Sequence, residues 1–256
     1  MNLERSCEDE VVKELIELQR AAPRYLSLDG RVAEDELFFA EQNARIVLHA
    51  EEYYRSMFQG DIISWNLRDR HMTETLNALC QHLDKRVGRA KLIVWEHNSH
   101  LGDARATEMG ERGEFNVGQL VREQYHNEAR LIGFTTHHGT VTAADDWDEP
   151  ARRKRVRPAL SESYEALFHD FDTPRFFLTL HEDPSVTSRL YRPRLERAIG
   201  VIYRPEMERI SHYFRTRITD QFDAVLHFDE TRAVEPLERN AEWEQEEPPE
   251  TYPTGI

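Results

Sequence analysis

The stretch of sequence at positions 91–105 reads KLIVWEHNSHLGDAR, an apolar run that ends in a group of polar side chains. The apolar run predicts a buried strand, and the residues after it predict a loop. That loop carries five side chains able to take part in chemistry: His97, Asn98, His100, Asp103 and Arg105. In open parallel α/β sheets, ligands bind beyond the carboxyl ends of the strands. We therefore expect this loop to be part of a functional site.

Similar apolar runs follow, with helical patterns between them. The predicted strands span 91–97, 129–136, 175–180, 198–204 and 224–229, and the predicted helices lie near 116–127, 161–169 and 206–217. This alternation is typical of an α/β fold with a mostly parallel or mixed sheet covered by helices. Helical spacing within 8–20, 33–58 and 67–85 predicts an N-terminal helical accessory part. The chain then divides into a helical part (1–88), an α/β core (89–237) and an acidic, proline-rich tail (238–256) that we expect to be disordered.

The charge balance excludes some classes of partner. Acidic residues number 48 and basic residues 33, so the net charge is −15. Such a surface repels phosphate groups, and we expect neither nucleic acid nor a membrane as partner. One basic run, 152–157, directly follows an acidic stretch, 145–149, and is predicted to be a charged loop that neutralises itself.

The cysteine content and the lack of targeting signals indicate a cytoplasmic location. Cys7 and Cys80 are the only cysteines, which fits free thiols in a reducing compartment. No apolar run approaches the roughly 20 residues of a membrane span, and the first residues lack the apolar centre of a secretion signal.

Histidines gather at the predicted strand ends. His137 and His138 end the second strand, and His227 lies in the last strand, close to Asp229. Histidine is the natural acid or base near neutral pH, so we expect a shared cleft in which His97, His100 and His138 meet. A metal held by these three histidines and Asp103 is an alternative. Because the zinc-helix pattern of two histidines four residues apart is missing, no resident metal or cofactor is assigned.

A covalent nucleophile is not indicated, since the chain has no G-x-S-x-G elbow, no P-loop and no G-x-G-x-x-G motif. A second polar cluster, Arg68 to His71, opens a predicted helix. Its simplest interpretation is a solvated helix start. The functional alternative is that Arg68 stabilises an anionic transition state.

Several segments together resemble the erythromycin esterase family. They are WNLRDRHMTETL, KLIVWEHNSHLGDARATEMG, NVGQL, IGFTTHHGTVTAA, WDEPARRKRVRPAL, IGVIYRPEMERISHYF and QFDAVLHFDETRAVEPL. The resemblance runs from about Arg5 to Leu237. Its more specific parts are the tryptophan–x–histidine–asparagine–x–histidine segment and the arginine–aspartate–arginine helix.

The resemblance implies hydrolysis of a carboxylic ester of a small molecule, by water that a histidine activates, without a covalent intermediate or a cofactor. His97 and His100 fall on the family's second histidine element and Arg68 on its helical arginine, so these three are the expected catalytic residues. Asn98, Arg105 and His138 are the expected substrate-binding residues. Glu96 departs from the pattern, because many relatives have a small residue there.

The family's first element, a strand ending in glycine–glutamate–x–x–histidine–glycine, has no counterpart in this sequence. The chain thus resembles the last two thirds of the family domain, and we expect impaired catalysis by this chain alone. Two alternatives stay open: a non-catalytic or split fragment that binds a ligand or a partner chain, and a metal-assisted hydrolase. The partners expected are an N-terminal complementing segment or a second copy that covers an exposed sheet edge.

Overall fold

The computed structural model describes residues 13, 16–17, 20–21, 31–57 and 60–235. Contacts divide the chain into two compact units: residues 1–95 with 113–121, and residues 96–112 with 122–256. The predicted tail at 238–256 and most of the predicted helix within 8–20 lie outside the described residues. The predicted division at 88 and 237 stays a prediction.

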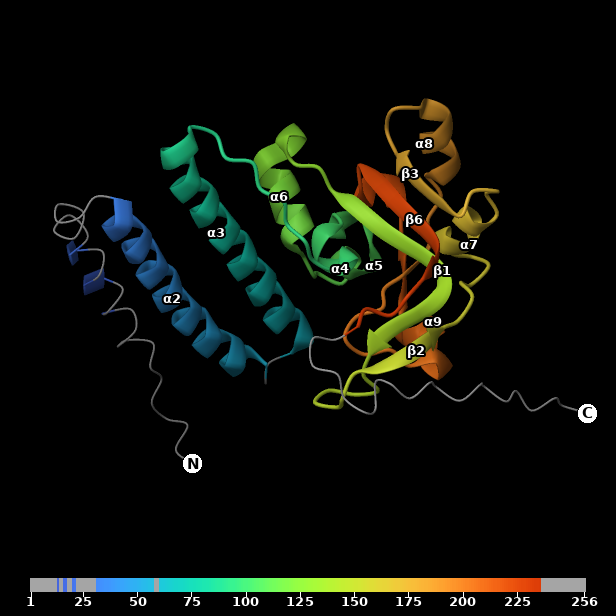
Figure 1. Cartoon of the computed structure of the whole chain (residues 1–256), viewed down its shortest axis with the longest axis horizontal. Helices are drawn as coiled ribbons and strands as arrows, with labels where there is room; N and C mark the ends of the chain where they lie inside the picture. Colours follow the sequence, from blue (N-terminus) through green and yellow to red (C-terminus); the bar gives the residue numbers. More distant parts are fainter. Residues whose placement is uncertain (1–12, 14–15, 18–19, 22–30, 58–59, 236–256) are drawn as a thin grey trace, which may run out of the picture. The chain divides into compact units, whose positions relative to one another are not determined.

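The first unit is built on two long helices, α2 (Arg31–Ser56) and α3 (Asp61–Val87), which lie side by side (Figure 1). Both confirm predicted helices, at 33–58 and 67–85. Asp35, near the start of α2, contacts His82 (2.7 Å) and Arg86 (3.0 Å) near the end of α3, so the two helices are antiparallel. The ring of Phe38 stacks on that of His82.

The second unit is built on a four-stranded mixed sheet of order β2-β1-β6-β3 (Figure 1). Its strands are β1 (Ile132–Ala143), β2 (Arg152–Val156), β3 (Arg175–Thr179) and β6 (Ala224–Thr231). The central pair, β1 and β6, is parallel, and both outer strands are antiparallel to their neighbours. A second, antiparallel pair joins β4 (Arg194–Arg197) and β5 (Tyr213–Thr216). The predicted α/β class with a mixed sheet is confirmed.

Short helices complete the structure. In chain order they are α4 (Asn98–Leu101), η1 (Ala104–Ala106), α5 (Glu108–Glu111), α6 (Val117–Tyr125), η2 (His126–Glu128), α7 (Tyr164–His169), α8 (Pro184–Leu190), η3 (Pro205–Met207), α9 (Glu208–Ser211) and α10 (Ile218–Gln221). Those at 117–125 and 164–169 confirm predicted helices. Ser163 caps α7, since its side chain accepts a hydrogen bond from the backbone of Ala166. No helix in the described part of the chain is long and apolar enough to cross a bilayer.

The core of the second unit lies between the sheet and α7. Its buried side chains are Leu131, Tyr164, Phe168, Leu180, Leu190, Ile218, Phe222 and Val225. The Tyr164 hydroxyl donates to the backbone carbonyls of Leu190 (3.1 Å) and Arg192 (2.9 Å), which ties α7 to the chain beyond α8. Burial of this apolar cluster fixes the face of the sheet that α7 covers.

The predicted strands at 129–136, 175–180 and 224–229 are confirmed, but two others are wrong. Residues 91–97 form no ladder with any described strand, and Ile93 is 96% and Trp95 79% exposed. Residues 198–204 contribute a single bridge, from Ile202 to Ala144. An apolar run reports hydrophobicity but not whether a partner strand lies beside it, and a strand needs that partner.

Two further predictions also fail in part. The predicted helix at 206–217 forms only η3 and α9 and ends at Ser211, because Tyr213 to Thr216 pair with β4 as strand β5. The predicted charged loop at 152–157 is strand β2. Its expected neutralisation does occur, since Lys154 and Arg152 both pair with Asp145.

Candidate functional site

His97 is locked at the start of α4 by three contacts. Its Nε2 lies 2.9 Å from the carbonyl of Ile199, and its Nδ1 lies 2.8 Å from the Ser99 hydroxyl and 3.2 Å from the Ser99 backbone nitrogen. Since a carbonyl can only accept, Nε2 carries the proton and Nδ1 accepts. Burial lowers the pKa of His97. Both ring nitrogens of this neutral imidazole are thus used to hold the loop.

Asn98 fastens the same loop to strand β1. Its Nδ2 donates to the carbonyl of Phe134 (2.7 Å), and its Oδ1 accepts from the backbone nitrogen of Phe134 (3.0 Å). The second hydrogen of Nδ2 goes to Glu196 Oε1 (3.1 Å). The amide group of Asn98 thus makes the two backbone hydrogen bonds to Phe134 that a neighbouring strand would make. Both hydrogens of its Nδ2, and its Oδ1, take part in hydrogen bonds.

Glu196, on β4, is a buried carboxyl group that no motif in the sequence singles out. It is fully buried, and its Oε2 has no hydrogen-bond partner among the described residues. Burial, and then the nearby carboxylate of Glu165, raise the pKa of Glu196 to about 8. The group is therefore protonated at neutral pH, so Asn98 is held by a neutral carboxylic acid.

Four histidines and one aspartate gather where α7 ends against β1 and β6. The rings of His137 and His169 stack with centroids 3.7 Å apart, and His137 Nδ1 lies 3.0 Å from His138 Nδ1. His169 Nδ1 contacts Asp229 Oδ1 at 2.6 Å. Burial, and then the neighbouring His169, lower the pKa of His137 to about 4. His227 is fully buried beneath this group.

The segment 197–199 touches both the locked loop and the histidine group. Ile199 accepts the hydrogen bond from His97, and the Arg197 guanidinium donates to the carbonyl of His137 (3.3 Å). Arg197 is itself fixed, because its Nε donates to the Tyr213 hydroxyl at 2.7 Å. The loop and the histidines of β1 are thus supported by one buried arginine and its neighbours.

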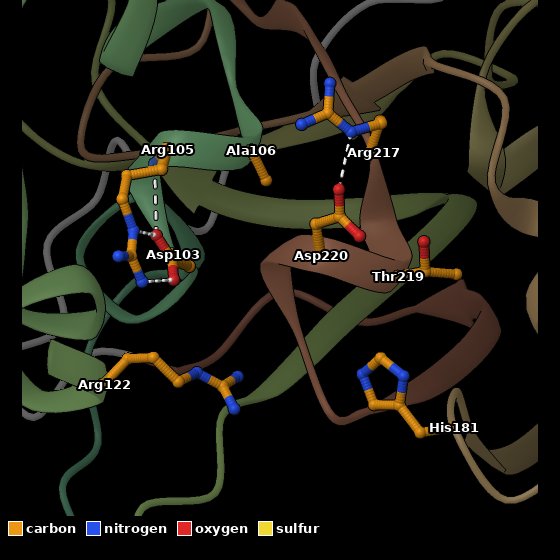
Figure 2. A pocket seen from close by; sticks show the side chains of 8 residues that line it. All are labelled: Asp103, Arg105, Ala106, Arg122, His181, Arg217, Thr219 and Asp220. Atoms are coloured by element: carbon orange, nitrogen blue, oxygen red, sulfur yellow. Dashed lines mark hydrogen bonds and ion pairs between the residues drawn. The ribbon is translucent and has the colours of Figure 1, made fainter. Parts of the chain in front are cut away.

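A cavity of about 420 Å³ adjoins the same loop. Its lining residues are Asp103, Arg105, Ala106, Arg122, His181, Arg217, Thr219 and Asp220 (Figure 2). Figure 2 shows Arg105 turned onto Asp103, with contacts of 2.6 and 2.9 Å, and Arg217 turned onto Asp220 (2.6 Å). The third guanidinium of the wall, that of Arg122, donates to Asp223 (2.9 Å). Each guanidinium is therefore paired with a carboxylate, and the pocket wall is polar without a large net charge.

The predicted site residues fall into three places. His97, Asn98 and His100 share α4 and the residue before it, and His100 is half-buried. Arg105 lines the cavity, and His138 lies on β1 in the histidine group. Arg68 belongs to the other compact unit, where its guanidinium stacks 4.9 Å from the centre of the Trp65 ring. The shared cleft of His97, His100 and His138 stays a prediction.

Comparisons with known proteins agree on one family. The model of the erythromycin esterase family matches residues 1–231 of this chain. A protein of Bacillus subtilis (strain 168), "Putative hydrolase YbfO", is 28% identical over 149 residues, which cover 56% of this chain and 32% of that protein.

Two solved structures with a similar fold illustrate the match. A protein of Bacillus cereus covers 88% of this chain with a TM-score of 0.65 and 18% identity, over 53% of its own length. A mutant of the erythromycin esterase EreC in its open conformation covers 86% of this chain with a TM-score of 0.57 and 16% identity, over 51% of its own length. The chain thus spans about half the length of these structures and about a third of the Bacillus subtilis relative.

The mixed sheet, with a polar loop held against its central strand, defines a protein of the erythromycin-esterase-like α/β fold. The family-model match extends over nearly all of the described residues. This chain belongs to the erythromycin esterase family.

Proposed function

We propose that this chain carries part of the active site of a carboxylic ester hydrolase that acts on a small molecule. The observation that supports this best is that one loop, residues 97–106, supplies both the histidines and one wall of the cavity. A cavity of about 420 Å³ lies within the usual range for small-molecule sites, roughly 300–1,000 Å³. The chain spans about half the length of the two solved structures, so the activity of a whole protein of this family belongs to the proposal.

His100 is the better candidate for the acid–base group of this reaction. His97 uses both ring nitrogens for Ser99 and Ile199, so it holds the loop in place and has no lone pair left for water. Asn98 is engaged in the same way by Phe134 and Glu196. We assign positioning roles to His97 and Asn98, and the proton transfer from attacking water to His100.

Substrate contacts are proposed for Arg105 and His138. Arg105 lies in the wall of the cavity, where a guanidinium can donate to the carbonyl oxygen of an ester. Asp103 holds it bidentately, which fixes the direction of its remaining donors. The developing oxyanion needs such prearranged donors.

Ester turnover tests this proposal. A panel of carboxylic esters and lactones is assayed with the chain alone and with the chain mixed with a segment that carries the family's first histidine element. We expect turnover in the mixture. His100→Asn should lower it by roughly 10²- to 10⁴-fold and should remove the ascending limb of the pH profile. His97→Asn should lower kcat but keep that limb, because His97 acts through the loop.

His126→Asn is the matched control, since His126 is exposed in η2 and lies outside the loop and the cavity. It should leave turnover unchanged. Turnover that is equal in the wild type and in His100→Asn would refute the proposed role of His100. If the chain binds a ligand but shows no turnover, either alone or in the mixture, a non-catalytic binding module would be favoured.

A further inference from the structure

The histidine group at the end of α7 has the composition of a metal site. His137 on β1, His169 at the end of α7 and Asp229 on β6 each offer one ligand atom, and these atoms lie within 4.8 Å of one another. Two imidazoles and one carboxylate are a ligand set that divalent transition metals prefer. None of the three lies in the loop or in the wall of the cavity to which the ester chemistry is assigned.

A second observation points to the same place. His227 is fully buried, and its Nε2 has no hydrogen-bond partner among the described residues. Its Nδ1 is engaged by the Thr135 hydroxyl at 2.9 Å, while Nε2 faces Asp229 Oδ1 at 3.6 Å, too far for a normal hydrogen bond. A buried nitrogen without a partner is unfavourable. When the ring carries its proton on Nδ1, the lone pair of Nε2 would face a cation bound at Asp229.

We propose that His137, His169 and Asp229 bind a divalent transition-metal ion such as Zn²⁺. His138, which contacts Nδ1 of His137, leaves the other nitrogen of that ring for the metal and orients it. His227 and the Thr135 hydroxyl lie beneath as a second layer.

Binding requires one adjustment of the side chains. Zn–N bonds of about 2.0–2.1 Å place tetrahedral ligands about 3.4 Å apart, whereas the three atoms here are separated by up to 4.8 Å. The parallel rings of His137 and His169 cannot both direct a lone pair at one point, so one ring must turn. The His169 side chain is 42% exposed and has room to do so.

The ion would also connect three elements of the second unit. His169 is the last residue of α7, whereas the other two ligands lie on the parallel pair of the sheet. A bound ion therefore ties the end of the helix to β1 and β6. Because the metal binds the folded state, it should raise the unfolding temperature, and the rise should grow with the concentration of free Zn²⁺.

Calorimetric titration with Zn²⁺ and visible spectroscopy with Co²⁺ test this proposal on the full chain after treatment with chelator. We expect one ion per chain, visible ligand-field absorption of Co²⁺, and an unfolding temperature that rises with Zn²⁺. His169→Asn and Asp229→Asn should each weaken binding by at least about 100-fold, because even loss of an outer-layer partner costs 10–100-fold.

His126→Asn serves as the control histidine and should bind the ion as the wild type does. Comparing the circular dichroism of metal-free proteins checks that the two ligand variants keep the fold. The proposal is overturned if the wild type binds no ion, or if His169→Asn and Asp229→Asn bind it as tightly as His126→Asn. These readouts do not depend on ester turnover, so they separate this site from the proposed hydrolase function.

Discussion

At the scale of single residues, the buried carboxyl of Glu196 determines how the loop of residues 97–106 is held. Its raised pKa, about 8, lies above the ordinary value of 4.5. An acid whose pKa is higher in the folded state stabilises that state fully below its unfolded pKa, and the contribution is lost as the pH rises through the folded pKa. Glu196→Gln keeps the Oε1 acceptor for Asn98 and cannot ionise. Between about pH 5 and pH 9, the free energy of unfolding should therefore fall less for this variant than for the wild type. The difference between the two falls should be on the order of a few kcal/mol.

Urea unfolding of both proteins across this pH range measures the difference. Glu162→Gln is the control, because the Glu162 side chain is 71% exposed, and it should follow the wild type at every pH. Parallel pH dependence of Glu196→Gln and the wild type would show that Glu196 does not carry a raised pKa.

At the scale of elements, Gly139 allows β1 to leave β6 and pair with β2. It is opposite Thr231 on one side and Val156 on the other, and its φ of +121° is rare for any other residue. An added Cβ would lie 2.1 Å from the Thr231 carbonyl oxygen. Gly139→Ala should therefore lower the free energy of unfolding by about 3 kcal/mol or more, since backbone strain and overpacking add. Urea denaturation followed by circular dichroism measures this loss.

Gly200→Ala is the matched control, since its φ needs no glycine and nothing lies within 4 Å of the added Cβ. We expect it to change stability by less than about 0.5 kcal/mol. Equal midpoints for both alanine variants would contradict the close approach of β1 and β6 at Gly139.

At the scale of the whole molecule, one face of the sheet presents apolar side chains to solvent. The strand register places Ile132, Phe134, Phe177 and Phe228 on the face opposite α7, and their exposed fractions are 39%, 39%, 55% and 38%. Contiguous apolar patches of this kind favour association. We expect the mass from sedimentation equilibrium to rise above 30.2 kDa with concentration, through a second copy of the chain. Phe134→Ser with Phe228→Ser should shift this rise to at least about tenfold higher concentration.

Trp147→Ser is the control for self-association, because Trp147 is an aromatic residue that is even more exposed (72%) but lies in a turn outside the sheet. It should associate as the wild type does. A mass that stays at 30.2 kDa at all concentrations would contradict the expected association.

The sequence by itself determined the features that depend on local pattern. Helical spacing predicted α2, α3, α6 and α7, and apolar runs predicted β1, β3 and β6, because these signals reflect which faces are buried. The motif around His97 and Asn98 led to the family, which the family model confirms. Only the tertiary structure decided how these side chains are used. Strand pairing, the proton held by Glu196 and the meeting of His137, His169 and Asp229 depend on residues distant in sequence, and no local pattern encodes such distances.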